Sequence, residues 1–191
     1  EGEEWEADQV VMATPAFAAA RILSGLDAAL VEDLREIDYS PVAVVGLGYR
    51  QPVAALDGFG LLTTTAAQQP VLGVLWDSSI FADRAPPGAQ SLRVLIGGQR
   101  QPELAAQDDA GLVATALQGV RQTMGVTATP DVTFVRTWRH GIPNYALGHR
   151  ERVARILARL SGHAGLYLTS NAYQGIAMND CTAQAAIIGE K

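Results

Sequence analysis

The sequence predicts a globular protein of mixed α and β structure. Of its 191 residues 48% are hydrophobic but only 6% are aromatic, so the core is expected to consist of aliphatic side chains. Short runs rich in β-branched residues alternate with Ala- and Leu-rich runs of helical spacing. Turns containing proline or glycine separate these runs.

The first forty residues are predicted to hold one strand and two helices. An apolar strand over residues 7–13 ends at Thr14 and Pro15. Pro15 is expected to open a helix that runs through Leu23, with Thr14 as its cap, because proline is tolerated in a first helical turn. A second helix is predicted over residues 28–37.

A meander of antiparallel strands is predicted after the break at Ser40-Pro41. The first apolar run after this break is rich in valine, which favours a strand. The predicted strands cover residues 42–49, 60–64, 71–76 and 92–97.

The second half of the sequence is predicted to alternate helices with strands. Helical spacing of apolar residues covers residues 104–124, 150–160 and 182–190. The predicted strands between them cover residues 132–138 and 165–170.

Charge and cysteine content exclude several classes of function. The formal net charge is −6 and no Lys/Arg run is dense enough for a phosphate-binding face, so we expect no nucleic-acid partner. Cys181 is the single cysteine, which favours a reducing, cytoplasmic compartment. No apolar stretch approaches the roughly 20 residues of a membrane span, although peripheral membrane contact stays open.

Three well-known sequence motifs are incomplete or absent. Gly46-x-Gly48 follows an apolar run, but Gln51 stands at the third glycine position of a dinucleotide fingerprint and Pro52 follows it. The three histidines have no partners at metal-ligand spacing, so no metal site is predicted. No Gly-x-Ser-x-Gly elbow supports a hydrolase.

Residues 166–181 carry the most informative local pattern, because a strand leads through a glycine-containing turn into a helix. The backbone N–H groups from Gly175 to Met178 are expected to face a phosphate or an electron-rich ring. Asn179 or Asp180 is expected to cap the helix. An ordinary strand–turn–helix connection fits the same spacing.

Several short elements, taken in order along the chain, resemble those of the protoporphyrinogen oxidases. They cover nearly the whole chain from Ala7 onward. The matching stretches are Asp57-Gly-Phe-Gly-Leu-Leu62, Asp77-Ser78-Ser79-x-Phe81 with Arg84-Ala85-Pro86, Ile96-Gly97-Gly98, Ile142-Pro-Asn-Tyr-Ala-Leu-Gly-His149, and Asn171-x-Tyr173-x-Gly175 followed by Asp180-Cys181.

The resemblance implies a two-domain flavoenzyme, related to amine oxidases, that oxidises a porphyrinogen by passing hydrides to FAD, with molecular oxygen as the reoxidant. It implies that residues 1–38 and 161–191 are two segments of a discontinuous, Rossmann-like FAD-binding domain. Residues 39–160 would form a mixed-sheet substrate domain. Because the sequence contains no Gly-x-Gly-x-x-Gly fingerprint, the FAD site is expected to be incomplete and the chain inactive alone.

Carried over residue by residue, the resemblance implies contacts but no catalytic residue. In the substrate domain it implies porphyrinogen contacts at Leu62, Leu75 and Leu95, although leucines in alternating strands are usually core. FAD contacts are implied at Thr14, Trp138, Gly175, Ile176, Ala177 and Met178, with Met12, Ala13 and Pro15 beside the cofactor.

Two other functions stay open. The chain could be a non-catalytic porphyrin-binding module, or part of a related flavin amine oxidase or carotenoid desaturase. The Ile-Pro-x-Tyr-x-Leu-Gly-His element speaks against the latter. Apolar surface left uncovered predicts self-association. The residues do not separate protoporphyrinogen from coproporphyrinogen as substrate.

Overall fold

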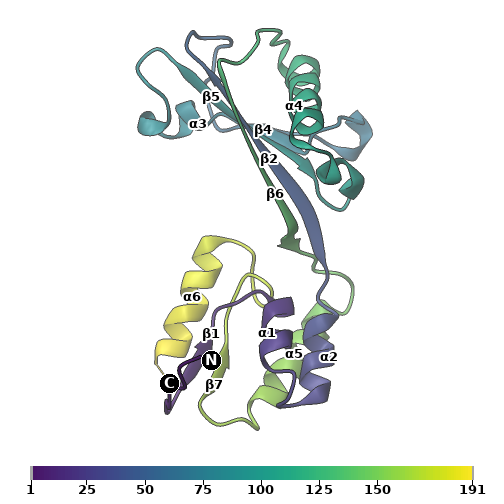
Figure 1. The fold of residues 1–191 in the computed structure, drawn as a ribbon, viewed down its shortest axis with the longest axis vertical. Helices are drawn as coiled ribbons and strands as arrows, with labels where there is room; N and C mark the ends of the chain where they lie inside the picture. The colour runs from purple at the N-terminus through teal and green to yellow at the C-terminus, as the bar shows by residue number, and fades with distance from the viewer. Residues whose placement is uncertain (1, 191) are drawn as a thin grey trace. The chain divides into compact units, whose positions relative to one another are not determined.

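Two units make up the fold in the computed structural model, which describes residues 2–190 (Figure 1). The central unit covers Tyr39–Ile142. The terminal unit combines the described residues up to Asp38 with those from Pro143 onward. The boundary predicted at residues 160/161 therefore differs from the division at 142/143, because helix α5 (His149–Leu160) packs against α2 (Ala28–Arg35) in the terminal unit.

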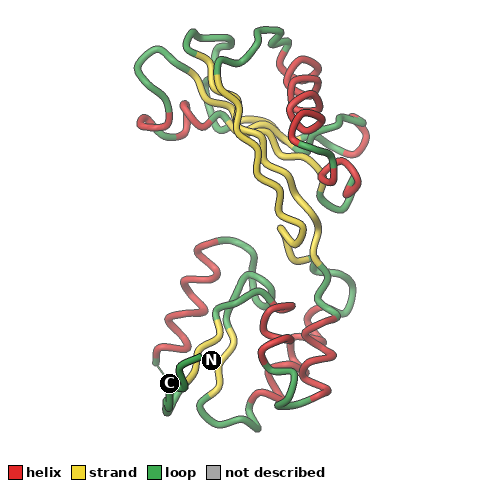
Figure 2. The backbone as a smooth tube through the Cα atoms, viewed as in Figure 1, coloured by secondary structure: helices red, strands yellow, loops and turns green. Residues whose placement is uncertain are grey.

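The central unit is built on a five-stranded sheet of order β3-β4-β5-β2-β6, drawn in yellow in Figure 2. The three pairs from β3 to β2 are antiparallel, as predicted. Strands β3 and β4 are three residues long and therefore shorter than predicted, whereas β6 is longer than predicted. The strands are β2 (Tyr39–Tyr49), β3 (Gly60–Leu62), β4 (Gly73–Leu75), β5 (Gln90–Gly97) and β6 (Val132–Pro143).

One face of this sheet packs against helix α4 (Asp109–Met124) to form the core. The predicted helix over residues 104–124 is divided, because the Asp108 carboxylate accepts the Gly111 N–H and starts α4 anew after the short helix η3 (Pro102–Ala106). The fully buried side chains of this core include Val45, Leu47, Val74, Leu92, Val94, Ile96, Leu112 and Val120.

Short helical segments complete the connections of the central unit. Helix α3 (Asp77–Ile80) follows β4 directly. The remaining turns are η1 (Thr65–Ala67) and η2 (Ala82–Arg84).

The terminal unit contains a parallel pair of short strands, β1 (Val10–Met12) and β7 (Leu166–Leu168). Each strand leads through a loop into a helix, α1 (Ala16–Ile22) after β1 and α6 (Met178–Gly189) after β7. The prediction of mixed α and β structure is therefore confirmed, with a parallel pair in one unit and antiparallel pairs in the other.

Two helix starts differ from the predictions. Helix α1 begins after Pro15, and the Thr14 hydroxyl finds no hydrogen-bond partner among residues 2–190, so Thr14 does not cap it. Helix α6 begins at Met178 instead of Thr182. The earlier start follows from Asp180, whose carboxylate accepts the Ala177 N–H at 3.0 Å and closes the first turn.

Ion pairs join α2 to α5 in the terminal unit. Asp33, which is buried, accepts hydrogen bonds from Arg155 Nε and Nη2 at 3.0 and 2.7 Å. Arg152 pairs with Glu36 one turn away. Arg152 and Arg155 therefore fasten α5 to α2.

Candidate functional site

A hollow in the terminal unit lies where the two parallel strands end. Open α/β sheets commonly bind ligands just beyond the carboxyl ends of their strands. The loop after β1 and the loop after β7 both reach this place, and α6 begins beside it. The hollow has a volume of about 640 Å³ and is lined by Ala13, Pro15, Thr169, Ser170, Asn171, Ile176, Met178, Cys181, Thr182 and Ala185.

The stretch from Gly175 to Met178 exposes mainly side chains, and not backbone N–H groups, to a possible ligand. Two of its N–H groups are already used, by Gly175 toward the Tyr145 hydroxyl and by Ala177 toward Asp180. The side chains of Ile176 and Met178 are 47% and 86% exposed. An apolar ring therefore fits this stretch better than a phosphate.

Gly175 is required by the backbone of this loop. Its φ of +113° lies in the region that L side chains rarely adopt. A Cβ added there would lie 2.5 Å from the Cβ of Asp180. The loop can therefore approach the start of α6 this closely only because Gly175 has no side chain.

Tyr145, which belongs to the Ile-Pro-x-Tyr-x-Leu-Gly-His element, forms hydrogen bonds to the same loop. Its hydroxyl donates to the Asn171 carbonyl at 2.9 Å and accepts the Gly175 N–H at 2.8 Å. Its ring stacks on buried His149 with 3.9 Å between centroids. Burial raises the pKa of Tyr145, which keeps this hydroxyl protonated as a donor. The sequence motif matched the family without revealing this role.

The central unit carries a second candidate surface, the sheet face opposite α4, which we call the open face. Leu62 lies opposite Gly73, and Gly73 lies opposite Leu95. In the next row Leu75 lies opposite Arg93. Because side chains alternate along strands, the three predicted leucines share this face while the buried valines of the same strands face α4. They are therefore not residues of the α4 core.

Strand β6 continues the open face. A Cβ added at Gly46 would lie 3.5 Å from the Cβ of Phe134, so Phe134 stands on this face. Alternation along β6 puts Trp138 on the same side, with the Arg136 guanidinium 5.0 Å from its ring centroid. Leu62 is 79% and Trp138 51% exposed, so the face is apolar and open.

The predicted site residues thus fall into two groups, one in each unit. Ile176 and Met178 line the hollow of the terminal unit, whereas Thr14, Gly175 and Ala177 are adjacent to lining residues without lining it themselves. The other group shares the open face of the central unit and consists of Leu62, Leu75, Leu95 and Trp138.

The described residues 2–190 offer neither a cluster of metal ligands nor a membrane-spanning helix. No group of three or more His, Cys, Asp or Glu side chains there could hold a metal ion. No helix in that range is long and apolar enough to cross a membrane.

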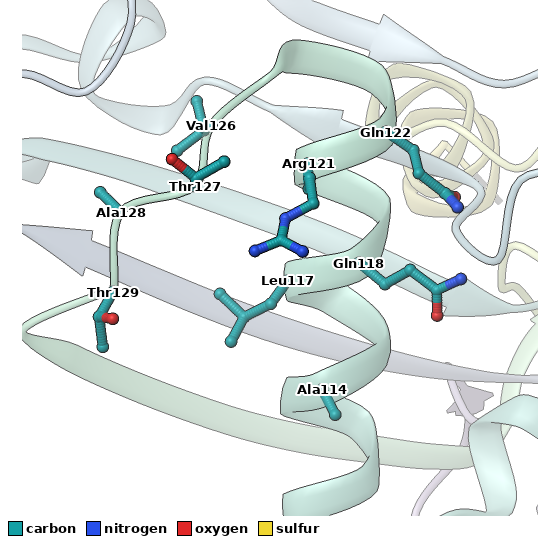
Figure 3. A pocket seen from close by; sticks show the side chains of 9 residues that line it. All are labelled: Ala114, Leu117, Gln118, Arg121, Gln122, Val126, Thr127, Ala128 and Thr129. Carbon is teal, nitrogen blue, oxygen red and sulfur yellow. The ribbon is translucent and has the colours of Figure 1, made fainter.

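A second hollow, of about 520 Å³, lies between α4 and the segment that follows it (Figure 3). The Arg121 side chain points from α4 toward this segment, and Leu117 lies below it (Figure 3). This hollow belongs to the α4 side of the central unit, away from the open face.

Comparison with known proteins shows the family of this chain. The model of the flavin-containing amine oxidoreductases matches residues 1–186. The chain belongs to this family. Spinach chloroplast protoporphyrinogen oxidase 1 is 31% identical over 184 residues, covering 90% of this chain and 33% of the relative. Human protoporphyrinogen oxidase is 32% identical, covering 92% and 38%.

A coproporphyrinogen III oxidase from Propionibacterium freudenreichii is 31% identical, covering 97% of this chain and 35% of the relative. A crystal structure of an Exiguobacterium protein assigned as a protoporphyrinogen oxidase superimposes with a TM-score of 0.81 at 24% identity, over 96% of this chain and 40% of that one. The chain therefore has the fold of the flavin amine oxidases and spans little more than a third of these relatives.

Proposed function

We propose that this chain is the C-terminal part of an FAD-dependent porphyrinogen oxidase, which oxidises protoporphyrinogen IX or coproporphyrinogen III to the porphyrin in heme biosynthesis. The relatives named for these two activities match almost the whole chain at about 30% identity, which supports this substrate class. Relatives of both names match equally well, so either substrate is compatible with the proposal.

The open face is the observation that carries the proposal. A porphyrinogen is a broad, largely apolar macrocycle, and binding it requires a wide apolar surface more than a set of acids or bases. Leu62, Leu75 and Leu95 offer that surface on neighbouring strands, and Gly73 between two of them adds no side chain. In this proposal the three leucines hold the macrocycle and exclude water from it.

The hollow of the terminal unit fits part of a flavin. Its position beyond the ends of parallel strands and its exposed Ile176 and Met178 suit an apolar ring. In this proposal Gly175 permits the close loop, and Ala177 and Thr14 remain expected flavin contacts. Trp138 belongs to the open face of the central unit and is not part of this hollow. A bound flavin would supply the acceptor for hydrides removed from the macrocycle, while these residues would orient it and exclude water.

Tight FAD binding and turnover are expected to need more than this chain supplies. No stretch of its sequence has the glycine-rich fingerprint that holds the pyrophosphate of a dinucleotide. The hollow has no cationic side chain among its lining residues that would replace that function. We therefore expect porphyrin binding without stable flavin binding.

The first experiment measures both ligands on the purified chain. Protoporphyrin IX is titrated by fluorescence quenching, and the absorption spectrum is recorded after FAD is added and free FAD removed. We expect porphyrin to bind and flavin to wash away. Retained flavin would contradict the incomplete site, and a chain that binds no porphyrin would contradict the proposed substrate surface.

A pair of variants locates the binding surface. Leu62→Ser changes an exposed leucine of the open face, and Leu147→Ser changes an exposed leucine of the terminal unit. Loss of one well-contacted leucine should weaken porphyrin binding roughly tenfold, since about 1.5 kcal/mol of burial is removed. The Leu147 variant should bind as the unchanged chain does. Equal effects would contradict the assignment to the open face.

A non-catalytic porphyrin-binding module is the second candidate, because the open face lies wholly within the central unit. The two candidates separate on redox chemistry. A longer parent chain that contains this sequence should oxidise porphyrinogen when loaded with FAD if the first is correct. Binding without oxidation by that parent would favour the second.

Self-association is expected from the same exposed face. Leu62, Phe134 and Trp138 leave apolar surface in contact with water, and larger patches of this kind favour association. Sedimentation of the purified chain should show species above the monomer as concentration rises. A single monomeric species at high concentration would contradict this expectation. Peripheral membrane contact of a longer parent remains part of the proposal, to be tested by vesicle flotation.

A further inference from the structure

Arg93 is a cationic residue of the open face that lies directly beside its leucines, whereas Arg136 lies on β6 against Trp138. Arg93 lies between Leu75 and Gly46 in the cross-strand register. Gly46 has no side chain, and a Cβ added there would contact Phe134 of β6 and no atom of Arg93. The residues of the neighbouring row are Leu62, Gly73, Leu95 and Val44.

Asp77 holds the Arg93 guanidinium in place. The Nε atom of Arg93 lies 3.0 Å from Oδ2 of Asp77 and 3.2 Å from Oδ1, and Nη2 also donates to Oδ1. Asp77 is the first residue of α3, directly after β4, and its side chain is only 16% exposed. The guanidinium is therefore oriented before any ligand arrives.

The pairing leaves donors available. A guanidinium has five N–H groups, and Asp77 occupies those on one edge. The Nη1 group of Arg93 has no hydrogen-bond partner within residues 2–190, and the side chain is 41% exposed. A planar fork with a free edge is the group best matched to a carboxylate.

We propose that Arg93 binds a carboxylate at the edge of the macrocycle and that Asp77 is its positioning residue. The inference rests on the proposed function, since it assumes that the macrocycle lies on the open face. The substrates named for the relatives carry propionate side chains around an apolar body, and the open face offers the Arg93 guanidinium, oriented by Asp77, directly beside its leucines. Arg93 thereby fixes the rotation of the macrocycle on the sheet.

A purely structural role for the pair makes a different prediction. A partly buried Arg–Asp bridge that only fastens α3 to β5 would leave ligand affinity unchanged when it is removed. A carboxylate-binding role requires that the loss depend on whether the ligand carries carboxylates. The ligand, and not the protein alone, therefore provides the test.

The experiment titrates coproporphyrin III and its methyl ester, in which every carboxylate is masked, by fluorescence quenching at low salt. Three proteins are compared, namely the unchanged chain, Arg93→Gln and Arg121→Gln. Arg121 makes the matched control, because it is an exposed arginine of the same unit on the α4 side (Figure 3).

We expect Arg93→Gln to weaken coproporphyrin binding about tenfold, the loss typical of one charge-assisted pair, and to change ester binding less than about twofold. Arg121→Gln should leave both affinities unchanged. Unchanged ester binding also shows that the variant remains folded.

The outcomes separate the two proposals. If the unchanged chain binds neither porphyrin, the open face is not a macrocycle site and the proposed function fails together with the inference. If it binds both and Arg93→Gln changes neither, or weakens acid and ester alike, the role of Arg93 is overturned while the open face stands. An equal loss of coproporphyrin affinity in Arg121→Gln would mean that the effect comes from the net charge of the protein, and it would overturn the inference as well.

Discussion

The two units reach stability by different routes. The central unit is one continuous stretch whose five-stranded sheet covers fully buried leucines with α4. The terminal unit joins the two ends of the chain through strands of three residues each. A two-stranded sheet is marginal by itself, so the terminal unit depends on its helices and on the ion pairs between α2 and α5.

The candidate sites differ in the same way. The open face is set by strand register, which fixes the side of every residue at once. The hollow is built from two loops and a helix start, so its shape depends on particular hydrogen bonds such as those of Tyr145. In the proposed function, the face built on strands binds the macrocycle and the hollow built on loops binds part of the flavin.

The largest expected effect tests whether the central unit folds by its own core. Leu47 is fully buried between β2 and α4, and Leu47→Ala should lower the free energy of unfolding of this unit by about 3 kcal/mol through the cavity it leaves. Amide exchange in β2 and β5 should accelerate, while exchange in α2 and α5 stays unchanged. Equal acceleration in both units would show that they unfold together.

The next effect concerns the helix pair of the terminal unit. Asp33→Asn should cost about 1–2 kcal/mol, because Arg155 loses a charged, buried acceptor. The matched control is Glu36→Gln, whose pair with Arg152 is more exposed and should cost less than about 0.5 kcal/mol. Urea unfolding followed by far-UV circular dichroism compares the two. Similar losses would argue against a special role of the buried pair.

A smaller and local effect is expected at the loop. Tyr145→Phe keeps the ring stacked on His149 but removes both hydrogen bonds of the hydroxyl. The loss of about 1 kcal/mol should speed exchange of the Gly175 amide roughly fivefold. The amide of Leu47 in the central unit serves as the internal control. An unchanged Gly175 amide would mean that other contacts hold the loop.

The smallest effect is a pH dependence of the terminal unit. The pKa of Asp27 is lowered, chiefly because its carboxylate accepts the Leu30 N–H, with help from the Ala29 N–H and from Arg159. A lowered folded pKa stabilises the fold above the usual value of 3.8, and this contribution is lost as the pH falls through the lowered pKa.

Asp27→Asn should abolish this part of the pH dependence, because asparagine caps a helix equally well but does not titrate over this range. Thermal unfolding between about pH 2 and pH 6 provides the measurement. A variant whose profile matches that of the unchanged chain would exclude Asp27 as the titrating group.

The sequence alone determined most elements and the family. Apolar periodicity placed β2, β5, α4 and α5 to within a few residues, except for the division at Asp108, because these elements bury one regular face. The ordered short motifs indicated a resemblance to the protoporphyrinogen oxidases, and the comparisons confirm that resemblance. The alternation of leucines was visible too, but not the side on which α4 would lie.

Only the tertiary structure decided which residues meet. The parallel pairing of β1 with β7, the bridge from Tyr145 to Gly175 and the pairing of Arg155 with Asp33 each join residues far apart in the sequence. Local propensity contains no information about such partners, since they depend on the path of the whole chain and on register. The sequence therefore specified the elements and their chemistry, and folding decided that the leucines would share a face with Arg93.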